Sequence, residues 1–139
     1  MNVTVEELID NFELLGNWDD RYMFIISLGK ELPVMADEHK VEDNRVHGCQ
    51  STVWLIIEPT DDTPVRMNIV ADSEAFIVKG LISILLTVYS GKTAREILDT
   101  DENAIFKQLG LDQHLSAGRR NGLHSMVNRI KALAKSLTS

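Results

Sequence analysis

The sequence predicts an α+β fold, in which a small antiparallel sheet packs against helices within one compact domain. Three observations support this class. The chain has 139 residues, enough for one substantial hydrophobic core. Two short apolar segments, 51–58 and 65–72, are separated by turn-forming residues and indicate a hairpin. Longer segments with helical spacing of apolar residues lie on both sides of this pair, so a single domain is predicted over residues 1–139.

The first predicted helix follows Thr4. The Thr4 hydroxyl can cap the helix, and Glu7 three residues later completes the pattern of a capping box. The apolar residues that then share one face are Val5, Leu8, Ile9, Phe12 and Leu15. Gly16 is expected to end the helix, and the acidic side chains are expected on its solvated face.

A second helix is predicted from Asp19 to about Gly29, because apolar residues recur there at helical spacing. Its inward residues include Tyr22, Ile25 and Ile26. Pro33 prevents the helix from continuing. The next segment, 35–45, is polar and charged, so a loop is expected to lead to Cys49.

Residues 51–58 and 65–72 are predicted to form an antiparallel hairpin. The first strand is apolar on both faces in its middle, so it should be covered on both sides. The second strand alternates more cleanly, and the segment 60–64 between them has the composition of a turn. This pairing places Cys49 just before the first strand and Asp72 at the end of its partner, at the same edge of the sheet.

A long apolar helix is predicted over residues 75–89, with Asp72 or Ser73 as its N-cap and Gly91 as its C-terminal cap. It is apolar on nearly every face, which predicts a place at the centre of the core. Lys79 interrupts it, and the unbroken apolar run is too short to cross a bilayer.

Three more helices are expected: 93–99, 102–109, and a last amphipathic helix that has Ser116 as its cap and ends at about Leu137. The inward residues of the last helix are Leu123, Met126, Val127, Ile130, Leu133 and Leu137.

Arg119 and Arg120 fall in the first turn of this last helix, where positive charge opposes the helix macrodipole. An arginine kept at such a position indicates that its charge pairs with another group. For Arg120 the favoured interpretation is an ion pair with an acidic loop, or plain solvation.

The chain carries 14 basic and 21 acidic side chains, a formal net charge of −7. This balance, without any basic block, argues against nucleic acid as a partner. The amino terminus has no basic start followed by an apolar run, so no secretory signal is expected. The single cysteine suits a reducing compartment, which predicts a cytoplasmic protein.

That cysteine, Cys49, lies where the polar loop runs into the first strand. One thiol cannot build a disulfide or hold an iron–sulfur cluster within one chain, but it can react. Gly48 leaves the sulfur approachable, and His47 could favour the thiolate. The plainer alternatives are that Cys49 is a small buried hydrophobe and that His47 is a solvated loop residue.

Asp43, His47 and Cys49 are residue types that bind metal ions, and His39 is near them in sequence. Their spacing matches no tetrahedral zinc pattern, so no metal site is predicted.

The run from Val46 to Leu55 reads Val-His-Gly-Cys-Gln-Ser-Thr-Val-Trp-Leu. It resembles the signature of the SufE family, Val-x-Gly-Cys-x-Ser-x-Val-Trp-Leu, at every fixed position. Other blocks resemble that family in the same order over nearly the whole chain. They are Trp18-x-x-Arg21-Tyr22 with Leu28-Gly29, Ala71-Asp72-Ser73 with Lys79-Gly80-Leu81, His114-Leu115-Ser116, Arg119 and Asn121-Gly122-Leu123.

Proteins of this family accept sulfane sulfur from a PLP-dependent cysteine desulfurase and pass it toward iron–sulfur cluster assembly. The resemblance implies that Cys49 attacks the persulfide of a SufS-type or CsdA-type desulfurase, becomes a persulfide itself and stimulates that enzyme. The PLP belongs to the partner, so this chain is expected to hold no cofactor and to be a carrier rather than an enzyme. The implied recipient is a downstream assembly scaffold, and a homodimer is left open.

The resemblance also implies a fold like that of SufE and IscU proteins, with about three strands, the third around Lys40–Val46. Arg119 matches the family's arginine and is a candidate to act beside Cys49. Asp72 is a second candidate, either near Cys49 or as the helix cap, and His47 is the weakest one. The apolar strand behind Gly48 further suggests that the sulfur tucks toward the core when idle and swings out on docking.

Two other classes of function compete with the sulfur carrier. An iron–sulfur scaffold of the IscU type is disfavoured because it needs several cysteines. A cysteine hydrolase would pair Cys49 with one of the histidines His39, His47, His114 and His124, a pattern too permissive to favour.

Overall fold

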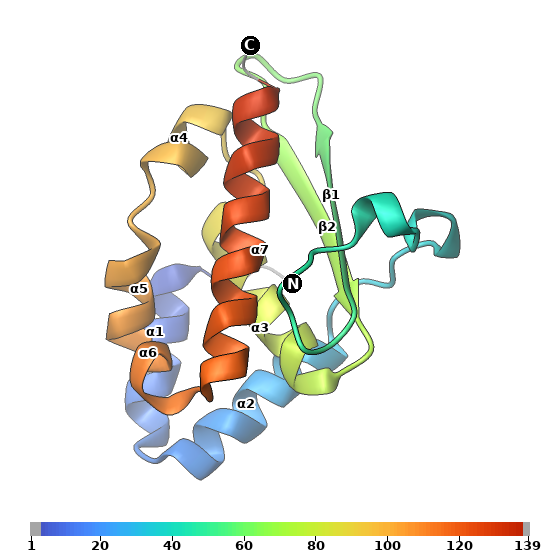
Figure 1. Ribbon diagram of the computed structural model, residues 1–139. Helices are drawn as coiled ribbons and strands as arrows, with labels where there is room; N and C mark the ends of the chain where they lie inside the picture. The colour runs from blue at the N-terminus through green and yellow to red at the C-terminus, as the bar shows by residue number, and fades with distance from the viewer. Residues whose placement is uncertain (1–3, 138–139) are drawn as a thin grey trace.

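Figure 1 shows the computed structural model, which describes residues 4–137. The elements in chain order are α1 (Val5–Leu15), α2 (Trp18–Lys30), the 3-10 turns η1 (Asp37–His39) and η2 (Glu42–Asn44), β1 (Val53–Pro59), β2 (Met67–Ser73), α3 (Phe76–Tyr89), α4 (Ala94–Asp99), α5 (Glu102–Leu109), α6 (Leu111–His114) and α7 (Ala117–Ser136). The helices and the two-stranded antiparallel sheet share one hydrophobic core. This arrangement confirms the predicted α+β class.

Helix α3 occupies the centre of that core, as its apolar sequence predicts. Every residue from Gly80 to Leu85 is buried, and so are Val88 and Tyr89. The helix packs against α1, α2, α7 and β2. Within residues 4–137, no helix is long and apolar enough to span a bilayer.

The predicted caps of α3 need correction. Strand β2 continues through Ser73, so Asp72 and Ser73 are strand residues, and the N-cap is Ala75, which makes no side-chain capping hydrogen bond. The prediction of Asp72 or Ser73 as the cap is therefore wrong. At the other end, Ser90 is the C-cap and Gly91 follows it with a φ of 79°.

The first two helices form a corner whose ends are set by local side-chain caps. The Thr4 hydroxyl accepts a hydrogen bond from the Glu7 amide at 3.2 Å, and Gly16 ends α1 with a φ of 73°. Helix α2 begins at Trp18, one residue before the prediction, because Asn17 caps it by accepting from the Asp20 amide.

Three residues of the family-like block in α2 tie this corner to the rest of the core. Arg21 Nε donates to the Phe12 carbonyl at 2.7 Å, and its guanidinium lies 5.5 Å from the Trp18 ring centre. Trp18 stacks on His114, and the Tyr22 hydroxyl donates to the His114 carbonyl. These contacts give the block a structural role in joining α2 to the end of α6.

The predicted hairpin is present, with Val53 opposite Ser73 and Pro59 opposite Met67. One face of β1 is buried through Val53 and Leu55, but Trp54 on the other face is only half-buried. The expectation that β1 is covered on both sides therefore holds for one face only. The second face is partly covered by Lys40, whose Nζ lies 5.6 Å from the centre of the Trp54 ring.

The third strand expected around Lys40–Val46 is wrong. The sheet has two strands within residues 4–137, and η2 (Glu42–Asn44) occupies the middle of that segment. Only its end pairs with β1, through an isolated bridge between Arg45 and Trp54 and a hydrogen bond from the Val46 amide to the Val53 carbonyl. The physical reason is composition: the segment is charged or polar at nearly every position and lacks the apolar alternation that a strand buries.

The remaining helices lie where the sequence predicts them, with two exceptions. The one-turn helix α6 has no counterpart in the prediction. Helix α7 is capped by Ser116, as predicted, but Leu137 is its exposed C-cap rather than an inward residue. Ala134 is buried instead, because the last turn of α7 extends past the core.

Candidate functional site

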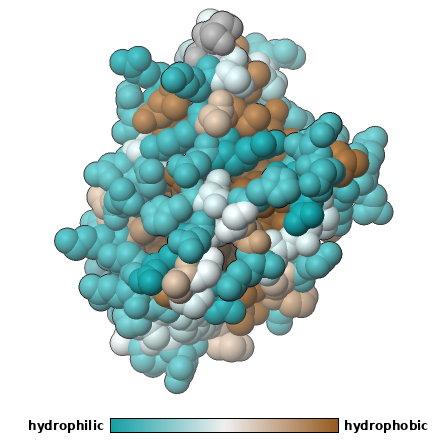
Figure 2. Space-filling model, viewed as in Figure 1, coloured by the Kyte–Doolittle hydropathy of each residue, from teal (hydrophilic) through white to brown (hydrophobic). Residues whose placement is uncertain are grey.

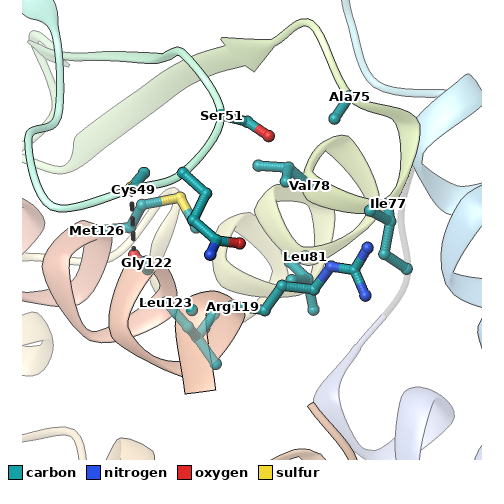
Figure 3. A pocket seen from close by; sticks show the side chains of 12 residues that line it. Cys49, Ser51, Ala75, Ile77, Val78, Leu81, Arg119, Gly122, Leu123 and Met126 are labelled. Carbon is teal, nitrogen blue, oxygen red and sulfur yellow. Dashed lines mark hydrogen bonds between the residues drawn. The ribbon is translucent and has the colours of Figure 1, made fainter. Parts of the chain in front are cut away.

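Cys49 lies in the loop between η2 and β1, which in Figure 1 leaves the 3-10 turns, crosses to α7 and returns to the hairpin. The thiol lines a pocket of about 100 Å³ where this loop meets the first turns of α3 and α7. The lining residues are Cys49, Gln50, Ser51, Ala75, Ile77, Val78, Leu81, Gly118, Arg119, Gly122, Leu123 and Met126. Figure 3 shows side chains that line the pocket, with Cys49 on one side of it and Ala75 and Ile77 on the other.

The sulfur itself is half-buried and faces α7. Its Sγ donates to the Gly122 carbonyl at 3.6 Å, the contact drawn as a dashed line in Figure 3. Burial raises the pKa of the Cys49 thiol above its ordinary value, and loss of hydration is the cause. A raised pKa lowers the fraction of thiolate, which is the reactive form of the sulfur, at any given pH.

Two helix glycines make room for the loop 45–52, which we call the reactive loop. A Cβ built on Gly118 would lie 2.3 Å from the side chain of Gln50, and one built on Gly122 would lie 3.4 Å from Cys49 Sγ. The loop thus rests on a stretch of α7 where side chains are missing. Sequence reasoning passed over Gln50 and Gly118, although two glycines four residues apart in a helix are a signal of close backbone approach.

Gly48 is required at its position for two reasons. Its φ is 91°, a conformation that side-chain-bearing residues rarely adopt, and a Cβ there would lie 2.5 Å from Ser125 Oγ. The residue turns the chain just before Cys49 and holds it close to α7.

Replacing Gly48 with alanine is expected to push the reactive loop away from α7. The backbone strain alone costs about 1–2 kcal/mol, and contact with Ser125 adds to it. Alkylation of Cys49 by a bulky maleimide should become faster, which a quenched time course followed by intact mass would measure.

A second substitution separates the two causes. Ser125→Ala removes the hydroxyl but not the strain, so adding it to Gly48→Ala should restore part of the slow alkylation. Equal alkylation rates for the native chain and the Gly48→Ala variant would contradict the role assigned to this glycine.

Arg119 reaches the site from the first turn of α7. Its backbone amide donates to Ser116 Oγ at 3.3 Å, and its side chain is exposed and lines the pocket. In Figure 3 the guanidinium extends across the pocket toward Ile77, away from Cys49. Within residues 4–137 it makes no ion pair, so its charge is free to meet a ligand or a partner; a role beside the thiol stays a prediction.

His47 lies on the other side of the loop. It is not among the residues that line the Cys49 pocket, and its Nε2 lies 3.4 Å from Glu42 Oε1. Its side chain is 70% exposed. The plainer expectation, a solvated loop histidine, fits this placement, and nothing in the geometry supports it as a base for Cys49.

Asp72 is buried at the hairpin edge, opposite Trp54 in the register. Its carboxylate lies 3.4 Å from Lys40 Nζ and 3.6 Å from Lys79 Nζ, and accepts from the Ser73 amide at 2.8 Å. It does not line the Cys49 pocket. Through Lys40 it fastens the segment that leads to the reactive loop, so its effect on Cys49 is indirect.

The other ionisable residues that the sequence makes candidates lie apart from the sulfur. His114 stacks on Trp18, His124 lines a different pocket, and His39 lies beside Glu38 in η1. In the part of the chain that the structure describes, no group of three or more His, Cys, Asp or Glu residues is placed to hold a metal ion.

The pocket has room for more than the thiol. By the same measure a single water molecule needs ~10–15 Å³, far less than the volume beside Cys49. Apolar side chains from α3 and α7 form much of its wall, with Ile77, Val78 and Leu81 from α3 and Met126 from α7. The site can therefore hold Cys49 with an added sulfur atom.

The comparisons with known proteins agree on one family. A family model described as Fe-S metabolism associated domain, SufE, matches residues 6–134. An uncharacterized SufE-like protein of Rhizobium etli is 46% identical over 134 residues, which cover 95% of this chain and 90% of that protein. A similar protein of Rhizobium meliloti is 43% identical over 133 residues and 95% of each chain.

One solved structure extends the likeness to three dimensions. The solution structure of a hypothetical protein from Thermus thermophilus has a TM-score of 0.76 against this chain, with 20% identity. The match covers 97% of this chain and 96% of that one, and it concerns the fold alone.

Proposed function

The chain belongs to the SufE family, whose members are accessory proteins of sulfur transfer with cysteine desulfurases, and on that premise we propose that Cys49 is its sulfur acceptor. The chain takes a sulfane sulfur from the persulfide of a desulfurase and carries it toward iron–sulfur cluster assembly. The supporting observation is the thiol itself, half-buried in an apolar pocket that has room for a second sulfur.

The transfer conserves atoms and electrons. Cys49 loses its proton, and its thiolate attacks the terminal sulfur of the partner's cysteine persulfide. A sulfur–sulfur bond forms at Cys49 while the one in the partner breaks, and the partner's cysteine leaves as a thiolate that takes up a proton. No external oxidant or reductant is required.

The resting position of the sulfur supports a two-state cycle. When the chain is free, burial keeps the thiol neutral and protected from oxidation. Docking draws the loop outward, and the sulfur becomes hydrated and reactive. Arg119, whose guanidinium points away from Cys49 in the free chain, then turns toward the loop and supplies positive charge near the developing thiolate.

The partner implied by this chemistry is a PLP-dependent cysteine desulfurase of the SufS or CsdA type. PLP is needed where the carbon–sulfur bond of free cysteine is broken, and that step occurs in the partner. The chain removes the persulfide sulfur from the desulfurase and so raises the turnover of that enzyme. A downstream assembly scaffold then receives the sulfur. In this proposal the chain needs no cofactor of its own.

The direct test is the mass of the intact chain after incubation with such a desulfurase and cysteine. A gain of one sulfur atom is expected, located at Cys49 by peptide mapping and removed by dithiothreitol. Absence of this adduct with every desulfurase of the same cell would refute the proposal.

The buried thiol predicts a distinctive pH dependence of alkylation. Because burial raises the Cys49 pKa in the fold, the rate with iodoacetamide should rise at a higher pH in the native chain than in urea, where the thiol pKa is about 8.5. The stability that the neutral thiol contributes is present below ~8.5 and is lost as the pH rises through the folded pKa. A native midpoint at or below that of the unfolded chain would contradict the protected resting state.

A further inference from the structure

A second hollow lies on the other side of the reactive loop. Arg45, Val46 and His47 form one wall and Ser125, Asn128 and Arg129 of α7 form the other, around an open space of about 390 Å³. We call this hollow the basic groove. Its first wall, residues 45–47, directly precedes Gly48 and Cys49 along the chain. A ligand bound in the groove therefore contacts the loop that carries the sulfur.

The charges in the basic groove are incompletely neutralised. Arg129 donates to the backbone carbonyl of Asp43 at 2.8 Å and makes no ion pair with any carboxylate of residues 4–137. The Nε atoms of Arg45 and Arg129 are both buried without an acceptor in that part of the chain. These two donors are left without an acceptor but are closed to solvent, so a ligand would have to bind through the terminal nitrogens of the guanidinium groups.

One internal carboxylate already contacts two residues of this groove, although it is not part of the groove's own lining. Glu42 places Oε2 3.5 Å from an Arg45 terminal nitrogen and Oε1 3.4 Å from His47 Nε2. Its side chain is 68% exposed, so another carboxylate can replace it at little cost. Glu42 shows that Arg45 and His47 together accept a carboxylate.

From these observations we propose that the basic groove is a docking site for an acidic segment of the cysteine desulfurase, whose carboxylate displaces Glu42 from Arg45 and His47. This inference rests on the proposed function and assigns part of its docking surface. Arginine offers paired donors that match a carboxylate, and Ser125 and Asn128 add neutral hydrogen-bonding groups beside them.

The acidic character of the rest of the chain makes a local basic site important for docking. The chain has a net charge of −7, and Figure 2 shows that hydrophilic side chains cover most of the face that α7 and the reactive loop form. An acidic segment is repelled by most of such a chain and attracted at the groove. Charge complementarity of this kind selects the docking orientation and speeds association.

Binding of a partner in the basic groove is also expected to affect the position of the reactive loop. Ser125 lies against Gly48, so a Cβ at residue 48 would meet its hydroxyl. A partner that binds both Arg45 and Arg129 therefore contacts the loop that carries Cys49 and also the helix α7 on which this loop packs. Docking and exposure of the sulfur are coupled through this contact.

The test uses a charge-matched pair of double variants and the desulfurase of the same organism. Arg45→Gln/Arg129→Gln removes two charges at the groove. Arg66→Gln/Arg95→Gln removes two charges at the turn end of the hairpin and on α4, away from the reactive loop. Desulfurase turnover is measured against the concentration of each chain, at low and at moderate salt.

The groove variant should raise the KM for the chain about five- to twentyfold at low salt and leave kcat within about twofold. Its KM should depend less on salt than that of the native chain, while the control double variant matches the native chain. Glu42→Gln removes the competing carboxylate and should lower the KM about two- to threefold.

Loading of Cys49 with sodium polysulfide, a small donor that needs no docking, should be the same in all variants. The circular dichroism spectrum of each variant shows separately that it is folded. Equal KM values and salt dependence for the groove and control variants would overturn the inference. If the native chain takes up sulfur from polysulfide but never from the desulfurase, the proposed function fails instead.

Discussion

A Cys49→Ser protein is expected to accept no sulfur from the desulfurase and to fold as the native chain does. Serine has nearly the shape of cysteine, and its hydroxyl can donate to the Gly122 carbonyl as the thiol does. An alkoxide does not form near neutral pH, so the attack on the partner's persulfide is lost. With cysteine carrying radiolabelled sulfur as the donor substrate, label on the Ser variant should fall to background.

Stimulation of the desulfurase should disappear in the same variant, while its melting temperature stays within a few degrees of the native value. Cys49→Ala provides the matched control, since it also lacks the thiol but cannot hydrogen-bond to Gly122. Label retained on the Ser variant as readily as on the native chain would refute the assignment of Cys49.

The largest effect on stability is expected at Gly80, where α3 meets α2. A Cβ at this position would lie 2.0 Å from the Ile25 carbonyl oxygen and 2.5 Å from Ile25 Cγ2. The obstacle is helix backbone, which cannot move aside as a flexible side chain can. Gly80→Ala should lower the free energy of unfolding by about 3 kcal/mol, because the two helices must separate.

Urea unfolding followed by circular dichroism measures this loss. Ser27→Ala on the exposed side of α2 is the control and should change the stability by no more than about 0.5 kcal/mol. Because α3 also supplies Ile77, Val78 and Leu81 to the pocket, Gly80→Ala should speed alkylation of Cys49 as well. A Gly80→Ala protein as stable as the native chain would contradict the close packing of α2 on α3.

The helices and the hairpin could be predicted because each has a signal within its own segment. The spacing of apolar residues in α1 and α3, and the turn residues between β1 and β2, are local properties of the sequence. The Lys40–Val46 strand failed because it was taken from family likeness rather than from such a signal. Contacts with distant residues hold that segment: an ion pair between Lys40 and Asp72 and a hydrogen bond from Arg129 to the Asp43 carbonyl. No local pattern contains these contacts.

The candidate site could be predicted only in part, because some of its features are local in the sequence and others depend on contacts between distant segments. Cys49 stands out as the only thiol, but whether His47 faces it depends on how the chain turns between them. Gly48, with its φ of 91°, sends the two side chains to different sides of the loop. The contact of Gln50 with Gly118 joins residues far apart in sequence, so it required the folded chain to be seen.

The two glycines of α7, Gly118 and Gly122, make room for the loop and also lower the stability of the helix around them. Each costs a helix about 1 kcal/mol relative to alanine, and Gly118 lies in the opening turn with Gly122 one turn further on. The wall that shelters the sulfur is thus the part of α7 most easily unwound. Local unwinding at this end of α7 would loosen the support under the loop and so ease its outward movement, without any shift of α3.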